Sequence, residues 1–192
     1  MEVFEAIRTR RSIRKYQSKP VDDKTLEMVL EAARLAPSWK NSQCWRLVVV
    51  RDSVIKQQLA DALLVKVPTN IAIEAAKQAP VLIVACAEVG KSGFSLRQPG
   101  IPQTDKGEWW YMFDVALAMQ NLILTAQSLG LGTVHIGLFD AGEAARILGV
   151  PGDFRVVSMT PLGYPDEQPE ARPRKPLSEI VFYDKYGANN AL

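Results

Sequence analysis

The longest apolar run of the chain lies between residues 108 and 132 and is hydrophobic on almost every helical face. A helix of this kind is normally the buried centre of a domain. As a helix, residues 109–131 would span roughly 33 Å, which is also long enough to cross a bilayer. However, Asp114 and Gln120 interrupt the run, and neither end has a basic flank. We therefore predict a buried core helix rather than a membrane span.

Shorter patterns on both sides of this run predict the other elements. Apolar residues at helical spacing predict helices near residues 3–8, 23–36, 53–64, 70–78 and 141–148, with N-caps at Asp22 or Asp23, at Ser53 and in a capping box of Asp140 with Glu143. Strands are expected at 47–50, 81–87, 133–138 and 154–160, the last ending at Pro161. The first two strand runs are continuous rather than alternating, which is typical of strands covered on both faces.

Two segments lack helical or strand periodicity. Residues 90–107 are rich in glycine, proline and charge, which favours a mobile surface loop or lid with a functional role. Residues 164–176 contain four prolines and predict an extended arm, which leads into the apolar segment 180–183. Since that segment needs burial away from its own core, we expect a second subunit to receive it. No linker divides the chain, so we predict one domain over residues 1–192.

Composition narrows the classes of function. A chain of 192 residues with a net charge of +2, from 23 basic and 21 acidic residues, is large enough for one core and does not suggest nucleic-acid binding. Cys44 and Cys86 lie far apart and suggest reduced thiols of a cytoplasmic protein. The single histidine, His135, excludes a multi-histidine metal site, and we expect no bound metal. The N-terminal residues lack the apolar segment of a secretion signal.

Two basic clusters are the main candidates for ligand binding. The first runs from Arg8 to Lys15 around Ser12, and the second contains Arg172 and Arg174. Arginine forks and a hydroxyl group suit a phosphate, while a solvated charged face and a nucleic-acid site stay open as alternatives. The loop 37–43 carries hydroxyl and amide groups that suit a flavin edge, or it is an ordinary polar turn. Glycine-rich dinucleotide, P-loop, nucleophile-elbow and metal motifs are absent from the sequence.

Four sequence stretches, taken together, resemble the FMN-dependent nitroreductase family. They are RRSIRKY at 10–16, APSWKNSQCW at 36–45, the run 109–137, and PLGYP at 161–165 followed by RPRKPL at 172–177. They occur in the family's order along nearly the whole chain. The resemblance implies an α+β fold with a central, mostly antiparallel sheet flanked by helices. It also implies a homodimer that exchanges the C-terminal arm, residues 165–192, and holds two FMN molecules at its interface.

The resemblance also assigns residues to the site. The implied FMN contacts from the basic clusters are Arg10, Arg11, Ser12, Arg14, Arg172 and Arg174. A loop from the partner subunit would contribute Pro37, Ser38, Asn41 and Gln43, and further ring contacts would come from Asn70, Ile136, Gly137 and Leu138. We expect Trp39, Trp109 and Trp110 to line a substrate pocket, where their flat faces could stack an aromatic acceptor. Cys44 departs from the family, which usually has proline there, and it places a thiol near the site.

The implied function is an oxidoreductase that uses FMN to move a hydride from NADH or NADPH to a nitroaromatic, quinone or related acceptor in two steps. The cofactor would carry the chemistry, so we expect no catalytic side chain, only electrostatic support from Arg14. Three alternatives stay open. These are a flavin storage or sensor protein, another reaction on the same fold such as reductive dehalogenation, and a basic module that binds nucleic acid.

Overall fold

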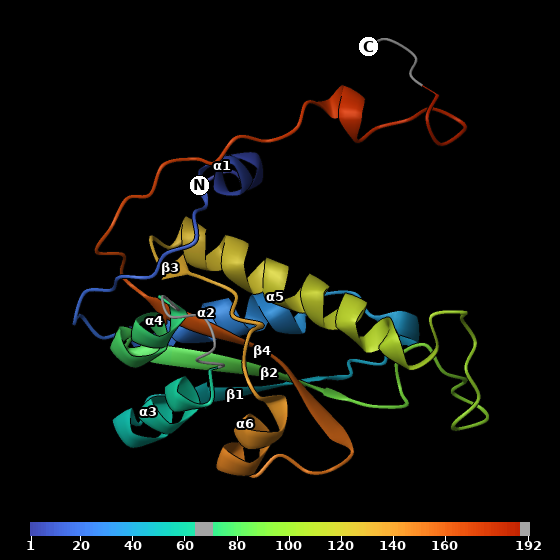
Figure 1. Ribbon diagram of the computed structural model, residues 1–192, viewed down its shortest axis with the longest axis horizontal. Helices are drawn as coiled ribbons and strands as arrows, with labels where there is room; N and C mark the ends of the chain where they lie inside the picture. The colour runs from blue at the N-terminus through green and yellow to red at the C-terminus, as the bar shows by residue number, and fades with distance from the viewer. Residues whose placement is uncertain (64–70, 189–192) are drawn as a thin grey trace.

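A four-stranded antiparallel sheet with helices on both faces forms the body of the computed structural model, which describes residues 1–63 and 71–188 (Figure 1). The strand order is β1-β2-β4-β3. The helices are α1 (Val3–Thr9), α2 (Asp23–Arg34), α3 (Ser53–Asp61), α4 (Ala72–Gln78), α5 (Trp110–Ser128) and α6 (Ala141–Leu148), and the strands are β1 (Trp45–Val50), β2 (Val81–Glu88), β3 (Gly132–Thr133) and β4 (Phe154–Gly163). Short 3-10 turns lie at Trp39–Asn41, Gly107–Trp109 and Leu177–Glu179. The predicted α+β class with an antiparallel sheet is confirmed.

Strand β2 lies in the middle of the sheet and separates two cores. Val81, Ile83 and Ala85 pack with α2 and α5, whereas the alternate residues Leu82 and Val84 pack with α3, α4 and α6. Side chains of a strand point to opposite faces in turn, so a continuous apolar run is needed when both faces are covered. The sequence pattern predicted this strand correctly, and all its residues through Ala87 are buried.

Helix α5 crosses the sheet as the central helix and packs in the core, as predicted, but one side of it is exposed in the single chain. Trp109, just before the helix, is 64% exposed. In the first turn, Phe113 is 56% exposed and Met112 is 44% exposed. Ala116 and Gln120 continue the same exposed stripe one and two turns later. The helix is apolar all round, yet the single chain covers only part of its surface. The uncovered stripe is therefore a candidate contact surface.

The helix caps lie at or next to the predicted residues, but their hydrogen bonds differ in part from those predicted. Asp22 caps α2 and Asp140 caps α6, each by accepting a backbone N–H three residues on. The return bond of the predicted capping box does not form. The Asp140 N–H instead donates to the Ala62 carbonyl, and the Glu143 carboxylate pairs with Arg146. Asp52, not Ser53, caps α3.

Three strand predictions also need correction. Strand β1 lies at the edge of the sheet, and its middle residues, including Leu47 and Val49, are only partly buried. The expected strand 133–138 shrinks to β3, followed by a single bridge from Ile136 to Met159. Strand β4 continues through Pro161 to Gly163. Proline fits because β3 pairs only with the last two residues of β4, so the ladder beside Pro161 is interrupted.

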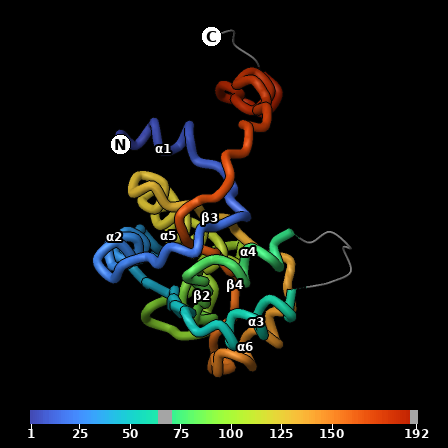
Figure 2. Tube along the Cα trace, turned by 90° about the vertical axis from the view of Figure 1, so that its left-hand side faces the viewer, coloured from blue at the N-terminus to red at the C-terminus, as the bar shows by residue number. Residues whose placement is uncertain are grey.

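The C-terminal arm leaves the end of β4 and runs past α1, and its last turn stands away from the rest of the chain in both views (Figures 1 and 2). Residues 166–176 form no helix or strand, as predicted. Leu177 and Ile180 are 60% and 58% exposed, so the apolar segment of the arm does not reach the core of its own chain. Among the described helices, none is long and apolar enough to cross a membrane.

Candidate functional site

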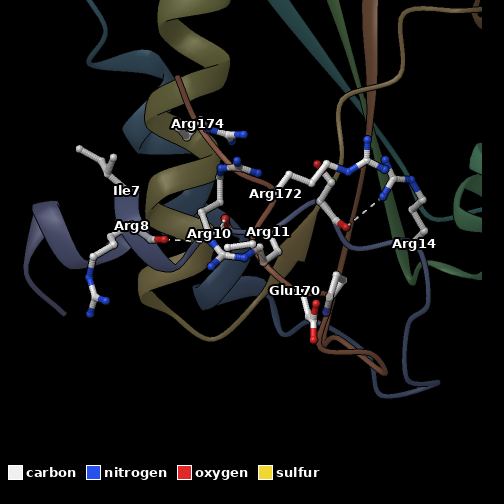
Figure 3. A pocket seen from close by; sticks show the side chains of 11 residues that line it. Ile7, Arg8, Arg10, Arg11, Arg14, Glu170, Arg172 and Arg174 are labelled. Atoms are coloured by element: carbon white, nitrogen blue, oxygen red, sulfur yellow. Dashed lines mark hydrogen bonds between the residues drawn. The ribbon is translucent and has the colours of Figure 1, made fainter. Parts of the chain in front are cut away.

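The two basic clusters, 162 positions apart at Arg10 and Arg172, meet in one pocket of about 380 Å³ (Figure 3). The pocket lies where the segment after α1 passes the arm. Its lining residues are Ile7, Arg8, Arg10, Arg11, Ser12, Arg14, Pro169, Glu170, Ala171, Arg172 and Arg174. Six of the predicted cofactor residues are therefore brought together by the fold. Arg8 belongs to the predicted first cluster but was not among the expected FMN contacts, and its side chain turns away from the other arginines (Figure 3).

Backbone pairing with β3 holds the first cluster in place. Ser12 forms a parallel bridge with Thr133, and the Ile13 N–H donates to the Thr133 carbonyl at 2.9 Å. This approach needs glycine at position 132, because a Cβ there would lie 2.6 Å from Ile13 Cγ1. The arginines therefore extend from a backbone that is fixed to the sheet.

The arm is tied to the same segment by residues just before the second cluster. The Glu167 carboxylate accepts from the backbone N–H groups of Arg14 and Lys15, and the Asp166 N–H donates to the Lys15 carbonyl. The pocket is thus built by one chain. Arm exchange, which we expected to deliver Arg172 and Arg174, is not needed to assemble it.

Positive charge dominates this pocket. Among the described residues, none of the five arginines at 10, 11, 14, 172 and 174 forms an ion pair with a carboxylate. Partial burial and the neighbouring charges of Arg174 and Arg11 lower the pKa of Arg10. One carboxylate, that of Glu170, also lines the pocket, but it is outnumbered by the guanidinium groups. Such crowding of positive charge is the arrangement expected of an anion site, because a bound anion relieves the repulsion.

The chain following β3 is a second candidate contact, close to the first cluster. His135 Nδ1 lies 3.1 Å from Thr160 Oγ1, and loss of solvation followed by the charge of Arg10 lowers the His135 pKa. Ile136 is buried, whereas Gly137 and Leu138 are exposed, and their N–H groups have no hydrogen-bond acceptor among the described residues. His135 was not singled out as a site residue, since a lone histidine gives no sequence motif.

The loop 37–43 lies at the opposite end of α5. The Trp39 N–H donates to the Asp114 carboxylate in the first turns of α5, whereas Gln127 near the end of α5 donates to Thr9, next to the first cluster. Asp114 and Gln127 are separated by about 20 Å along the helix axis at 1.5 Å per residue. The loop and the basic pocket of one chain therefore lie at opposite ends of this helix.

The other predicted site residues fall in different surroundings. Asn70 lies outside the described residues. Trp39 and Trp110 pack edge to face with 5.3 Å between ring centroids, and the Trp39 indole N–H donates to the Phe94 carbonyl. Trp109 faces solvent. Within one chain, the three tryptophans lie beside the loop 37–43 and not beside the basic pocket.

Cys44, the departure from the family pattern, is fully buried with its thiol 3.9 Å from Asp114 Oδ2. Burial and the Asp114 charge raise its pKa to about 11, and burial raises that of Cys86 to about 11. At pH 8, about one thiol in a thousand would be ionised, against about one in four for a free cysteine. We expect neither thiol of the native protein to react with a disulfide reagent within minutes, and both to react after denaturation. A native thiol that reacts as fast as a free thiol would contradict this assignment.

Comparison with known proteins shows the family of this chain. The nitroreductase family model matches residues 7–164. A nitroreductase family protein of Clostridium novyi superimposes with a TM-score of 0.77 at 32% identity, covering 98% of this chain and 96% of that one. The Vibrio harveyi NADPH:FMN oxidoreductase, solved with NAD+, gives 0.81 at 29% identity over 98% and 79% of the two chains. A Thermus thermophilus NADH dehydrogenase is 31% identical over 91% of this chain and 92% of its own. The chain therefore belongs to the nitroreductase family.

Proposed function

We propose that this protein is an FMN-dependent NAD(P)H oxidoreductase that reduces a nitroaromatic, quinone or related acceptor. The observation that carries the proposal is the pocket of unpaired arginines, which joins two clusters distant in sequence. Relatives named for FMN and NADPH support the choice of cofactor and reductant. FMN, when bound, supplies hydride transfer between NAD(P)H and the acceptor. The chain itself must hold the phosphate, orient the ring and stabilise developing charge.

The residues present fit FMN in chemical type. Arg10, Arg172 and Arg174 would hold the phosphate by charge-assisted hydrogen bonds, with the Ser12 hydroxyl as a neutral partner. The exposed N–H groups of Gly137 and Leu138 would donate to acceptor atoms of the ring. Arg14 would place positive charge where the ring gains negative charge on reduction.

The complete site requires two chains in this proposal. The polar loop 37–43 and the three tryptophans lie one helix length from the basic pocket of their own chain, so one FMN cannot contact both within a protomer. A two-fold dimer that packs the exposed stripes of α5 together would bring the loop of one chain to the pocket of the other. Trp39, Trp109 and Trp110 would then line the acceptor pocket, and Asn41 and Gln43, now exposed, would face the ring.

The arm of the partner is our candidate to cover the free edge of the sheet. Among the described strands, β1 pairs only with β2. A groove of about 340 Å³ beside it is lined by Leu30, Trp45, Leu47 and Val49, together with charged residues. Figure 1 shows that the arm of the same chain ends on the far side, away from β1. The exposed apolar side chains of the arm, Leu177, Ile180, Val181 and Tyr183, are complementary to this groove, since each surface is apolar and uncovered in a single chain.

Purification tests this function directly. We expect the protein to carry FMN, identified by mass, and to lose its visible flavin absorbance when NADH or NADPH is added without oxygen. Nitroaromatics or quinones should restore the absorbance, whereas restoration only by halogenated phenols would favour reductive dehalogenation. Bound FMN that neither nicotinamide reduces would indicate storage or sensing. A colourless protein that binds oligonucleotides and not added FMN would overturn the proposal.

A further inference from the structure

Polar donors converge on one oxygen of a buried side chain near the start of α5. Asp114 is 1% exposed, and its Oδ2 accepts from the Trp39 N–H at 2.9 Å and from the Ser92 hydroxyl. The Ser42 hydroxyl and the Cys44 thiol face the same oxygen at 3.4 and 3.9 Å. Asp114 has no ion pair within the part of the chain that the structure describes. Hydrogen-bond donors therefore satisfy this acceptor, and its removal would leave the buried Ser92 hydroxyl and the part-buried Trp39 N–H without this partner.

These donors come from two loops that the sequence does not connect. Trp39, Ser42 and Cys44 belong to the segment after α2, whereas Ser92 begins the loop 90–107. The two loops also touch directly, through the Trp39 indole and the Phe94 carbonyl and through Lys40 and Gln103. Asp114 is thus the point at which both loops are fastened to the central helix.

The segment held by Asp114 is strained. Lys40, Asn41 and Gln43 have φ values of 46°, 56° and 46°, in the left-handed region that residues with a Cβ rarely adopt. Such conformations persist where surrounding contacts hold them, and they occur at ligand-binding positions. The Gln43 N–H donates to Ser38 Oγ within the loop, and Arg46 donates to the Gln43 carbonyl. The bonds of the loop to helix α5 run to Asp114, and the others run to the loop 90–107, which Asp114 also holds through Ser92.

We propose that Asp114 is a positioning residue for the FMN site of the partner subunit. It touches neither phosphate nor ring. It holds the loop 37–43 in the strained shape that presents Asn41 and Gln43, and it couples that shape to the loop 90–107 beside the acceptor pocket. This inference rests on the proposed function, because that function assigns the loop to the partner's FMN.

Hydrogen exchange of the FMN-free dimer tests the anchor without any flavin chemistry. In Asp114→Ala, the amides of residues 38–45 should exchange faster than in the unmodified protein, while those of residues 10–14 keep their protection. Asp114→Asn keeps one acceptor oxygen and should fall between the two. It also keeps the test available if the alanine variant fails to fold.

Titration with FMN then connects the anchor to the site. We expect Asp114→Ala to raise the FMN dissociation constant about 10- to 100-fold, by analogy with the loss of metal affinity when a residue that orients a metal ligand is removed. Lys56→Met is the matched control. It removes another buried charged group, bonded to the Ala79 carbonyl on the other face of the sheet, and should leave both measurements unchanged.

The outcomes separate this inference from the proposed function. Unchanged exchange at residues 38–45 would overturn Asp114 as the anchor, even if the unmodified protein binds FMN and is reduced by NADH. Faster exchange with unaltered FMN affinity would overturn the link between the loop and the flavin. Failure of the unmodified protein to bind FMN would instead contradict the proposed function itself.

Discussion

Replacing both Arg10 and Arg174 with alanine is expected to abolish retention of FMN during purification. A hydrogen bond to a charged group contributes about 1.5–3 kcal/mol, so the loss of two corresponds to about 3–6 kcal/mol and a dissociation constant raised roughly 10²- to 10⁴-fold. These two side chains lie close enough in the pocket for the charge of one to lower the pKa of the other. Fluorescence titration with added FMN gives the measurement.

Riboflavin, which lacks the phosphate, shows whether these arginines act on that group. The double variant should bind riboflavin about as well as the unmodified protein does, so its preference for FMN over riboflavin should disappear. Arg51→Ala with Arg146→Ala is the control, because it removes two positive charges that pair with Asp23 and Glu143 away from the pocket. Equal losses for FMN and riboflavin would show that the variant disturbs the fold and not the phosphate site.

Removing the end of the arm is expected to have a different effect from removing its arginines. A chain that ends at Lys175 keeps Arg172 and Arg174 but lacks the apolar residues 177–183. Burying each large apolar side chain of that segment is worth roughly 1.5–3 kcal/mol before the cost of ordering the arm. We therefore expect the dimer to weaken by several orders of magnitude, as measured by light scattering over a range of protein concentrations.

A second truncation separates the two roles of the arm. At concentrations that restore the dimer, the chain ending at Lys175 should bind FMN again, because its basic pocket is intact. A chain ending at Pro169 lacks both arm arginines and should not bind FMN at any of these concentrations. If the chain ending at Lys175 stays a tight dimer, the apolar segment does not hold the subunits together.

The sequence correctly predicted elements that are set by nearby residues or by burial on both faces. Strand β2 is apolar on both faces because both are covered, and Asp22 and Asp140 mark helix starts by their short acceptor side chains. The arginine clusters were predicted from residue type and resemblance to contact FMN, with the second cluster delivered by an exchanged arm, whereas the fold brings both into one pocket of a single chain. Such patterns can be recognised in a sequence because few other local structures are compatible with them.

Features that depend on distant partners were not predictable in this way. The apolar run of β1 suggested two covered faces, although β1 is an edge strand whose middle residues are only partly buried. In the sequence, Asp114 only interrupts the apolar run of a core helix. Its donors are far away along the chain: Trp39 and Cys44 lie 75 and 70 positions earlier, and Ser92 lies 22 positions earlier. The return bond at Asp140 was replaced by a contact with Ala62, which local sequence does not encode.

Mixed dimers test most directly the claim that each FMN site is shared between subunits. One parent carries Arg10→Ala with Arg174→Ala, the other carries Ser38→Ala with Asn41→Ala, and each is expected to be free of flavin. In a dimer of the two, purified through different tags, the intact pocket of the second parent meets the intact loop of the first. We predict that such dimers bind one FMN per two chains and regain reduction by NADH. If the mixed dimers bind no FMN, each site lies within one chain and the shared-site account is wrong.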